Sequence, residues 1–208
     1  MAIESVLRGR TFQLFGGHPA LDLVNTLDWR FRQGQQEELL KTYSDLMGFA
    51  GQSLLIDPKE MRRLLRGGSD DSRNKALSAV RDLREALANV LYAAVDTRPP
   101  ASHAFETLEK SFKKAHALQK LQWNATGASW IWSGDDLPSE MPLWRLALSA
   151  EELITSEQLA LVRACAKPDC RWLFLDTSKN HTRRWCNMQL CGNRMKARRF
   201  KAQRRAEI

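Results

Sequence analysis

CAKPDCRWLFLDTSKNHTRRWCNMQLC is the sequence of residues 165–191, and it contains all four cysteines of the chain. They form two close pairs, Cys165 with Cys170 and Cys186 with Cys191. Two such pairs separated by a short span are how a chain presents four thiolates to one tetrahedral ion. Zn²⁺ suits four soft thiolates, and it has no redox chemistry of its own. The sequence therefore predicts one structural zinc ion held by these cysteines.

Other uses of four cysteines are less consistent with this pattern. Disulfide bonds conflict with the reducing compartment expected below, and cysteines used only for packing would not cluster in pairs. An iron–sulfur cluster stays open as an alternative, although the neighbouring basic residues favour a nucleic-acid module. His181 lies between the pairs, and we interpret it as a polar loop residue because four thiolates already complete the shell.

The spacer and the segment after the last cysteine predict the rest of a small finger. Residues 172–175 are strand-like, residues 176–180 carry turn chemistry, and residues 183–185 return towards Cys186. The aromatic residues of this spacer are expected to form a miniature core, because so small a unit has little else to bury. From residue 188 to about residue 206 the chain lacks proline, which predicts a helix. A knuckle, a hairpin and a final helix together describe a treble-clef-like zinc finger.

Positive charge gathers at the same end of the chain. The whole chain of 208 residues carries +8, whereas residues 161–208 hold thirteen Lys and Arg against three acidic residues. That segment therefore carries +10 and the first 160 residues carry −2, which favours a polyanionic partner for the basic end. A solvated tail kept for solubility is the alternative. The predicted nucleic-acid contacts are Arg183, Arg184, Arg194, Lys196, Arg198, Arg199, Lys201, Arg204 and Arg205.

Composition excludes several classes of protein. With 43% hydrophobic and 27% charged residues, the chain is neither a disordered tail nor a membrane protein. No apolar run approaches the roughly 18–20 residues that a membrane helix needs. The first five residues, MAIES, lack the basic-then-apolar layout of a secretory signal. We therefore expect a cytoplasmic protein.

Ahead of the cysteines the pattern predicts a mainly α fold with a minor β component, as a helical domain over residues 1–158 followed by the finger over residues 159–208. The longest helix should span about Asp71 to Asp96, where apolar residues recur three or four apart. Asp57 precedes a first-turn proline and a glutamate at the third helical position, which is a strong helix start. Further helices are expected from Pro19, with Ser44 and with Ser102 as N-caps, over Leu143–Ile154 and over Ser156–Cys165.

A β-hairpin interrupts the predicted helices. Residues 121–124 and 129–132 alternate in character around a Thr126-Gly127 turn. Four of the seven tryptophans fall between residues 123 and 144. We favour core packing for them, and an apolar pocket is the alternative. These residues are Trp123, Trp130, Trp132 and Trp144.

A polar cluster lies at the start of the first helix. Asp22 and Asn25 are three residues apart and so are neighbours on a helix face. With His18 and Thr26 they form a candidate small-ligand site. The favoured alternative is structural, with Asp22 and Asn25 fixing the preceding Gly-Gly turn and the helix start by hydrogen bonds.

The finger resembles a known family. Cys191-Gly192-Asn193-Arg194, preceded by Trp185-Cys186 and by residues 172–178, is similar to the CGNR zinc finger. The resemblance covers about residues 161–205, and the four cysteines follow the family pattern without departure. It implies a zinc-bound, DNA-binding C-terminal module.

The preceding domain resembles the ABATE domain that usually accompanies this finger. The similarity rests on Gly16-Gly17-His18, on residues 21–26 and on Trp144-Arg145-Leu146-Ala147. Together, the two resemblances cover most of the chain. They imply a bacterial, stress-induced transcription regulator.

We therefore expect a transcription regulator that contacts double-stranded DNA through a basic zinc finger. RNA binding and a non-catalytic protein-interaction module with a structural zinc are the alternatives. We do not expect an enzyme, because four thiolates close the coordination shell, whereas a catalytic zinc keeps an open position. A homodimer formed through the helical domain and a small-molecule effector bound there are two further partners left open.

Overall fold

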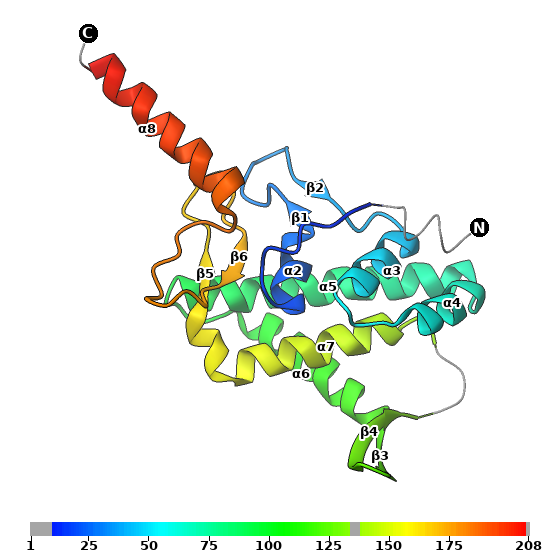
Figure 1. Ribbon diagram of the computed structural model, residues 1–208. Coiled ribbons are helices and arrows are strands. Elements are labelled where there is room, and N and C mark those ends of the chain that lie inside the picture. Colours follow the sequence, from blue (N-terminus) through cyan, green and yellow to red (C-terminus); the bar gives the residue numbers. More distant parts are fainter. Residues whose placement is uncertain (1–9, 134–137, 207–208) are drawn as a thin grey trace.

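The computed structural model describes residues 10–133 and 138–206, without the side chains of residues 199–201 and 205–206. Helices make up most of these residues, and short antiparallel strand pairs complete them, as Figure 1 shows. The predicted mainly α fold is thus confirmed. Within the described ranges, no helix combines the length and apolar character needed to cross a bilayer. The paired strands are β1 (Leu27–Asp28) with β2 (Glu37–Glu38), β3 (Gln119–Asn124) with β4 (Gly127–Trp132), and β5 (Val162–Ala164) with β6 (Leu173–Leu175).

Residues 10–133 and 138–155 form a helical body around one long helix, α5. Helices α2, α3, α6 and α7 all pack on α5 (Figure 1). Leu83, Leu87 and Leu91 lie on its inner face and are almost completely buried, in one core with Leu146 of α7. Burying each such side chain contributes about 1.5–3 kcal/mol. The helices are α2 (Pro19–Asn25), α3 (Tyr43–Gln52), α4 (Pro58–Arg66), α5 (Asp70–Val95), α6 (Ser102–Ala117) and α7 (Met141–Thr155).

Local capping explains where these helices start. Asp57 caps α4 as predicted, since its side chain accepts from the third helical residue, Glu60, whose carboxylate bonds back to the Asp57 amide. The predicted N-caps Ser44 and Ser102 are both wrong. Ser102 lies inside α6, whose N-cap residue is Ala101 and makes no side-chain capping bond. Thr42 caps α3, because Asp45 completes the reciprocal capping box with Thr42, whereas Ser44 lies inside the helix.

The predicted hairpin is confirmed as β3–β4, but its tryptophans do not all enter the core. Trp144 of α7 is buried and Trp132 is half-buried against the core. Trp123 and Trp130, by contrast, are 81% and 63% exposed, so their predicted core packing is wrong. The hairpin projects from the body in Figure 1. Alternation in the sequence predicts which residues share a face of the hairpin, but it does not predict whether other elements cover that face.

The finger begins directly after α7. The helix predicted over residues 156–165 is wrong, since only a short 3₁₀ turn forms before the chain extends into β5. β5 pairs with β6, Val162 opposite Leu175 and Ala164 opposite Leu173, and this pairing places Cys165 at the end of a strand. The helix predicted after the cysteines is present, and in Figure 1 it projects away from the body. The remaining elements are η1 (Glu157–Leu161), the π-helical turn η2 (Met188–Gly192) and α8 (Asn193–Ala206).

The apolar core continues from the body into the finger. Val162, Leu173 and Leu175 are buried in the same cluster as the α5 leucines. The apolar core therefore extends across the predicted boundary between residues 158 and 159. The division into two domains stays a prediction.

Candidate metal centre

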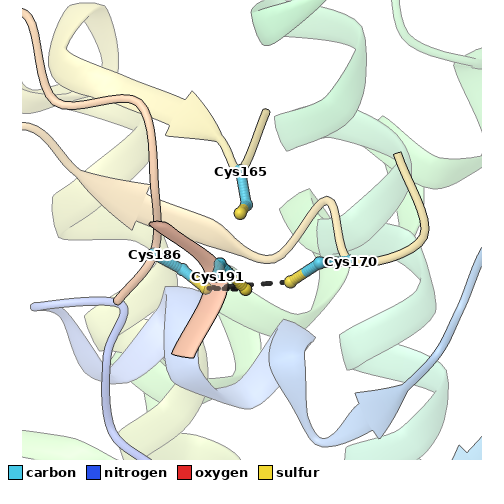
Figure 2. A group of neighbouring side chains, drawn as sticks. All are labelled: Cys165, Cys170, Cys186 and Cys191. Atoms are coloured by element: carbon cyan, nitrogen blue, oxygen red, sulfur yellow. Dashed lines mark hydrogen bonds between the residues drawn. The ribbon is translucent and has the colours of Figure 1, made fainter. Parts of the chain in front are cut away.

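The four cysteines come from two turns that face each other (Figure 2). Cys165 directly follows β5, and Cys170 lies in the turn that leads into β6. Cys186 precedes η2, and Cys191 lies within it. Each turn thus supplies one pair of thiols, as the spacing predicts.

Backbone hydrogen bonds shape the first turn. The Cys165 amide donates to the Trp172 carbonyl at 2.9 Å, which closes the end of the β5–β6 ladder. The Lys167 carbonyl accepts from the amides of Cys170 and Arg171 at 2.9 and 3.3 Å. Arg171 has a left-handed backbone, with φ of 51°, which L residues rarely adopt. These bonds fold the thiols of Cys165 and Cys170 onto one side of the turn.

The second turn is built on Asn187. Its side chain accepts from the Leu190 amide at 3.0 Å, and its carbonyl accepts from the amides of Cys191 and Gly192 at 2.9 and 3.2 Å. A Cβ atom at Gly192 would lie 2.3 Å from the Met188 sulfur. The glycine after the last cysteine therefore lets the Met188 side chain pack closely against the turn, and a Cβ at this position would require that side chain to move.

The sulfur atoms have the separations that a zinc ion requires. All four lie within 4.8 Å of one another, and Cys186 Sγ is 3.7 Å from both Cys170 Sγ and Cys191 Sγ. A tetrahedral ion with Zn–S bonds of about 2.3 Å places its ligands about 3.8 Å apart. The four thiols are free, and all but Cys170 are buried. The cluster is therefore able to hold one zinc ion, as predicted.

The pKa values of the four thiols are shifted by their contacts with one another and by burial. Hydrogen bonds from the thiols of Cys170 and Cys186 hold the pKa of Cys165 far below its usual range. The same contacts with Cys165 raise the pKa of Cys170 and Cys186, and burial raises the pKa of Cys191. Four clustered thiols therefore resist losing all their protons together unless a cation offsets the negative charge. Zinc would supply the positive charge and release protons, so its affinity rises with pH.

A small apolar cluster surrounds the cysteines, which confirms the predicted miniature core. Phe174 is fully buried and Trp172 nearly so, and both pack with the cysteines. Phe15, from the segment before α2, completes this cluster together with Trp185. The contribution of Phe15 has no signal in the sequence, because it comes from the far end of the chain.

The guanidinium of Arg183, a predicted nucleic-acid contact, bonds within the fold. Its guanidinium lies 4.3 Å from the centre of the Phe174 ring. The Arg183 nitrogens donate hydrogen bonds within the fold, so we leave this residue out of the nucleic-acid interface proposed below. They donate to the carbonyl oxygens of Phe15, Leu175, Trp185 and Cys186.

The other predicted nucleic-acid contacts whose side chains the structure describes lie on the finger surface. Arg184 is exposed and its guanidinium lies 5.4 Å from the Trp185 ring centre. The side chains of Arg199, Lys201 and Arg205 lie outside the described part of α8. The exposed basic side chains on α8 are those of Arg194, Lys196, Arg198 and Arg204.

The polar cluster at α2 has a structural role. His18 caps the helix, because its Nδ1 accepts from the Ala20 amide at 3.2 Å. Asp22 accepts from the Gly16 amide at 2.7 Å, which fixes the glycine turn as expected. Thr26 donates from its hydroxyl to the Leu23 carbonyl at 2.6 Å.

Asn25 makes a contact that the sequence does not indicate. Its side-chain NH₂ donates to the Leu173 carbonyl, and its side-chain oxygen accepts from the Leu173 amide, both at 2.9 Å. Asn25 thus binds the backbone of β6 instead of the glycine turn. Both residues are buried, so this pair of bonds fixes the finger strand on α2.

Further contacts across the same junction were not predicted. The Tyr92 hydroxyl donates to the Arg171 carbonyl at 2.9 Å, and the Trp172 indole donates to Asp28 at 2.9 Å. Arg32 pairs with Asp169 at 2.6 Å. Residues of the body therefore hold both ends of the first cysteine turn.

Comparison with protein families gives two consecutive matches. Residues 17–157 match ABATE, described as "Putative stress-induced transcription regulator". Residues 162–204 match the CGNR zinc finger. A search of the curated proteins found no match. On these matches and the cysteine cluster, the chain belongs to the ABATE family and carries a C-terminal CGNR zinc finger.

Proposed function

We propose that this member of a transcription-regulator family contacts double-stranded DNA through α8 of its zinc finger. The observation that carries this proposal is the charge of the helix. Its sequence from Asn193 to Ala206 contains basic residues throughout and no acidic one. In Figure 1 it projects from the body, where a polyanion can approach it.

Three basic side chains of α8 are available to an external partner. Arg194, Lys196 and Arg198 are exposed, and none of them is paired with an acidic residue in the described part of the chain. Fourteen helical residues extend about 21 Å. Such a helix fits the B-DNA major groove, which is about 12 Å wide, while its outer cations reach phosphates.

Zinc gives this helix its orientation in the proposed mechanism. Cys191 lies two residues before Asn193, so the metal shell would fix the first turn of α8 to the finger. Four thiolates leave no open position on a tetrahedral ion, which supports a structural zinc and a non-enzymatic protein. In this proposal zinc orders the finger, the ordered finger orients α8, and α8 then binds the DNA phosphates.

The test compares two sets of charge removals on the full zinc-loaded chain. Replacing Arg194, Lys196 and Arg198 by Ala should weaken binding to a labelled duplex by on the order of tenfold or more. The slope of log affinity against log salt should become shallower by about 0.9 for each phosphate that the variant no longer neutralises. Fluorescence anisotropy over a salt series measures both quantities.

A matched control removes the same charge from the opposite end of the molecule. Lys59, Arg62 and Arg66 lie exposed on α4, and their replacement by Ala should leave DNA affinity unchanged. Equal losses in both sets would mean that only overall charge matters. If structured RNA displaces the duplex at lower concentration than DNA competitors do, the partner is RNA.

A further inference from the structure

The β3–β4 hairpin has one apolar and one largely polar face. Near the turn the apolar face is exposed to solvent, whereas Trp132, at the other end of the same face, packs against the core of the body. Alternation along the pair places Lys120, Gln122, Asn124, Ser129 and the half-buried Ile131 on one face, away from the other. We call that opposite face the exposed hairpin face. Its exposed part consists of Leu121, Trp123, Ala128 and Trp130, and the half-buried Gln119 and Trp132 continue the same face towards the body.

The members of this face are contiguous. Leu121 pairs directly with Trp130, and Trp123 pairs with Ala128, so the two indoles are diagonal neighbours. Leu121 is 61% exposed, Trp123 81% and Trp130 63%. Contiguous apolar surface of this kind marks an interaction site, whereas isolated exposed leucines do not.

We infer that the exposed hairpin face binds the same face of a second copy of this chain. A two-stranded hairpin is marginally stable by itself, and a partner that covers its apolar face removes that weakness. The two indoles present roughly 300 Å² per copy, and so roughly 600 Å² in a symmetric pair. Specific interfaces bury about 1,200–2,000 Å², so the indoles would supply up to about half of one, and the exposed Leu121 of each copy would add to it.

The absence of charge on this face favours a second copy over a polyanion. The exposed hairpin face contains no charged residue, so a two-fold contact would place no like charges against each other. Single-stranded nucleic acids and anionic membranes require cations beside the aromatic residues. The nearest cation on β3, Lys120, belongs to the opposite face.

The position of the hairpin is compatible with the proposed function but does not depend on it. In Figure 1 the hairpin and α8 project from different ends of the molecule. A pair formed through the hairpins would leave both α8 helices uncovered. Dimer formation and DNA binding can therefore be measured, and can fail, separately.

Sedimentation equilibrium of the zinc-loaded full chain across the micromolar range tests the proposal. The wild-type chain should be a dimer at the upper end of this range. Trp123→Ser combined with Trp130→Ser should weaken dimerisation by on the order of a hundredfold. The control Lys120→Ser with Gln122→Ser changes the opposite face and should leave the dimer intact.

Two further measurements keep the test independent of folding. Ala128→Arg leaves the tryptophans in place but puts two like charges into the contact, and it should also give monomers. Zinc content and the thermal midpoint of the monomer should match between variants. A wild-type chain that is monomeric at every concentration, or a dimer unaffected by all changes to this face, would overturn the inference.

Discussion

The helical body and the finger are stabilised in different ways. In the body, α5 and its neighbours bury leucines in a continuous apolar core. The finger buries few apolar side chains around its cysteines, chiefly Trp172 and Phe174. So small a core cannot offset the conformational entropy of ordering the finger. The body can therefore fold by burial alone, whereas the finger needs its metal.

The junction between α2 and β6 stabilises part of the finger without metal. β6 contributes Leu173 to the core of the body, and Asn25 binds the Leu173 backbone. Half of the finger is therefore attached to the body without metal, through the strand that connects to Cys170. We expect the first cysteine turn to stay near its place when zinc leaves, and the second turn with α8 to detach.

Cys186→Ser should have the largest effect, because it should unfold part of the finger and leave the helical body folded. Structural zinc binds finger peptides with about 10–16 kcal/mol, and removing one thiolate forfeits much of this free energy. The variant should lose zinc, and its far-UV circular dichroism should lose only the contribution of α8. Zinc content after dialysis and helical signal check the two parts.

His181→Ala is the matched control, since His181 lies between the cysteine pairs and its Nδ1 is 2.9 Å from the Asp176 carbonyl oxygen. This variant should retain zinc in full. If Cys186→Ser instead unfolds the body together with the finger, body and finger are one cooperative unit.

The next effect in size belongs to the body. Leu87→Ala empties a fully buried position of α5 and should cost about 2–5 kcal/mol of unfolding free energy. Zinc content should not change, because the site lies outside the metal cluster. Urea unfolding measures the loss, and Leu54→Ala, at a position 91% exposed, should cost little. Similar losses for the two leucines would contradict a body held by burial.

The third effect tests the junction. Asn25→Ala leaves the amide and the carbonyl of Leu173 unpaired in a buried place and should cost about 2–4 kcal/mol. Part of the loss should appear as weaker zinc binding in competition with a chelator. Asn89→Ala is the control, since Asn89 bonds the Ala101 amide within the body at 2.9 Å. Equal zinc affinity in the two variants would mean that the junction does not support the metal site.

The weakest effect is a pH dependence that Asp22 gives to the body. Burial raises the pKa of Asp22 to about 7, well above its value in the unfolded chain. The folded state thus binds the proton more tightly, so stability is lost as pH rises from about 4 to about 7. Asp22→Asn should flatten this profile and stabilise the body at pH 8 by roughly 1–3 kcal/mol.

Thermal unfolding over a pH series measures this dependence. Asp82→Asn, on the exposed side of α5, should leave the profile as in wild type. An unchanged slope in Asp22→Asn would assign the dependence to another group.

The sequence predicted those parts of the site whose partners are near in the chain. The cysteine pairs need only local turns to converge, and the Asp57 box closes within a single helical turn. The bond between Asn25 and Leu173 could not be predicted, because it joins residues 148 positions apart. No local pattern distinguishes an asparagine that caps a turn from one that binds a distant strand.

Two other differences have the same origin. An arginine beside a metal turn can face solvent or bond to carbonyl oxygens, and only the folded chain shows that Arg183 bonds within the finger. Likewise the tryptophans of β3–β4 share a face by alternation, yet their burial depends on what lies opposite. The hairpin projects from the body, so Trp123 stays exposed.

X-ray absorption at the zinc edge, measured on the reduced 208-residue chain, tests most directly whether the finger is built by four thiolates around one metal ion. We expect one zinc per chain with four sulfur ligands at about 2.3 Å. In the Cys186→Ser variant this four-sulfur signal should vanish. A purified wild-type chain that is free of metal yet keeps an ordered α8, or a zinc ion with nitrogen or oxygen ligands, would contradict a finger that depends on its four-thiolate zinc.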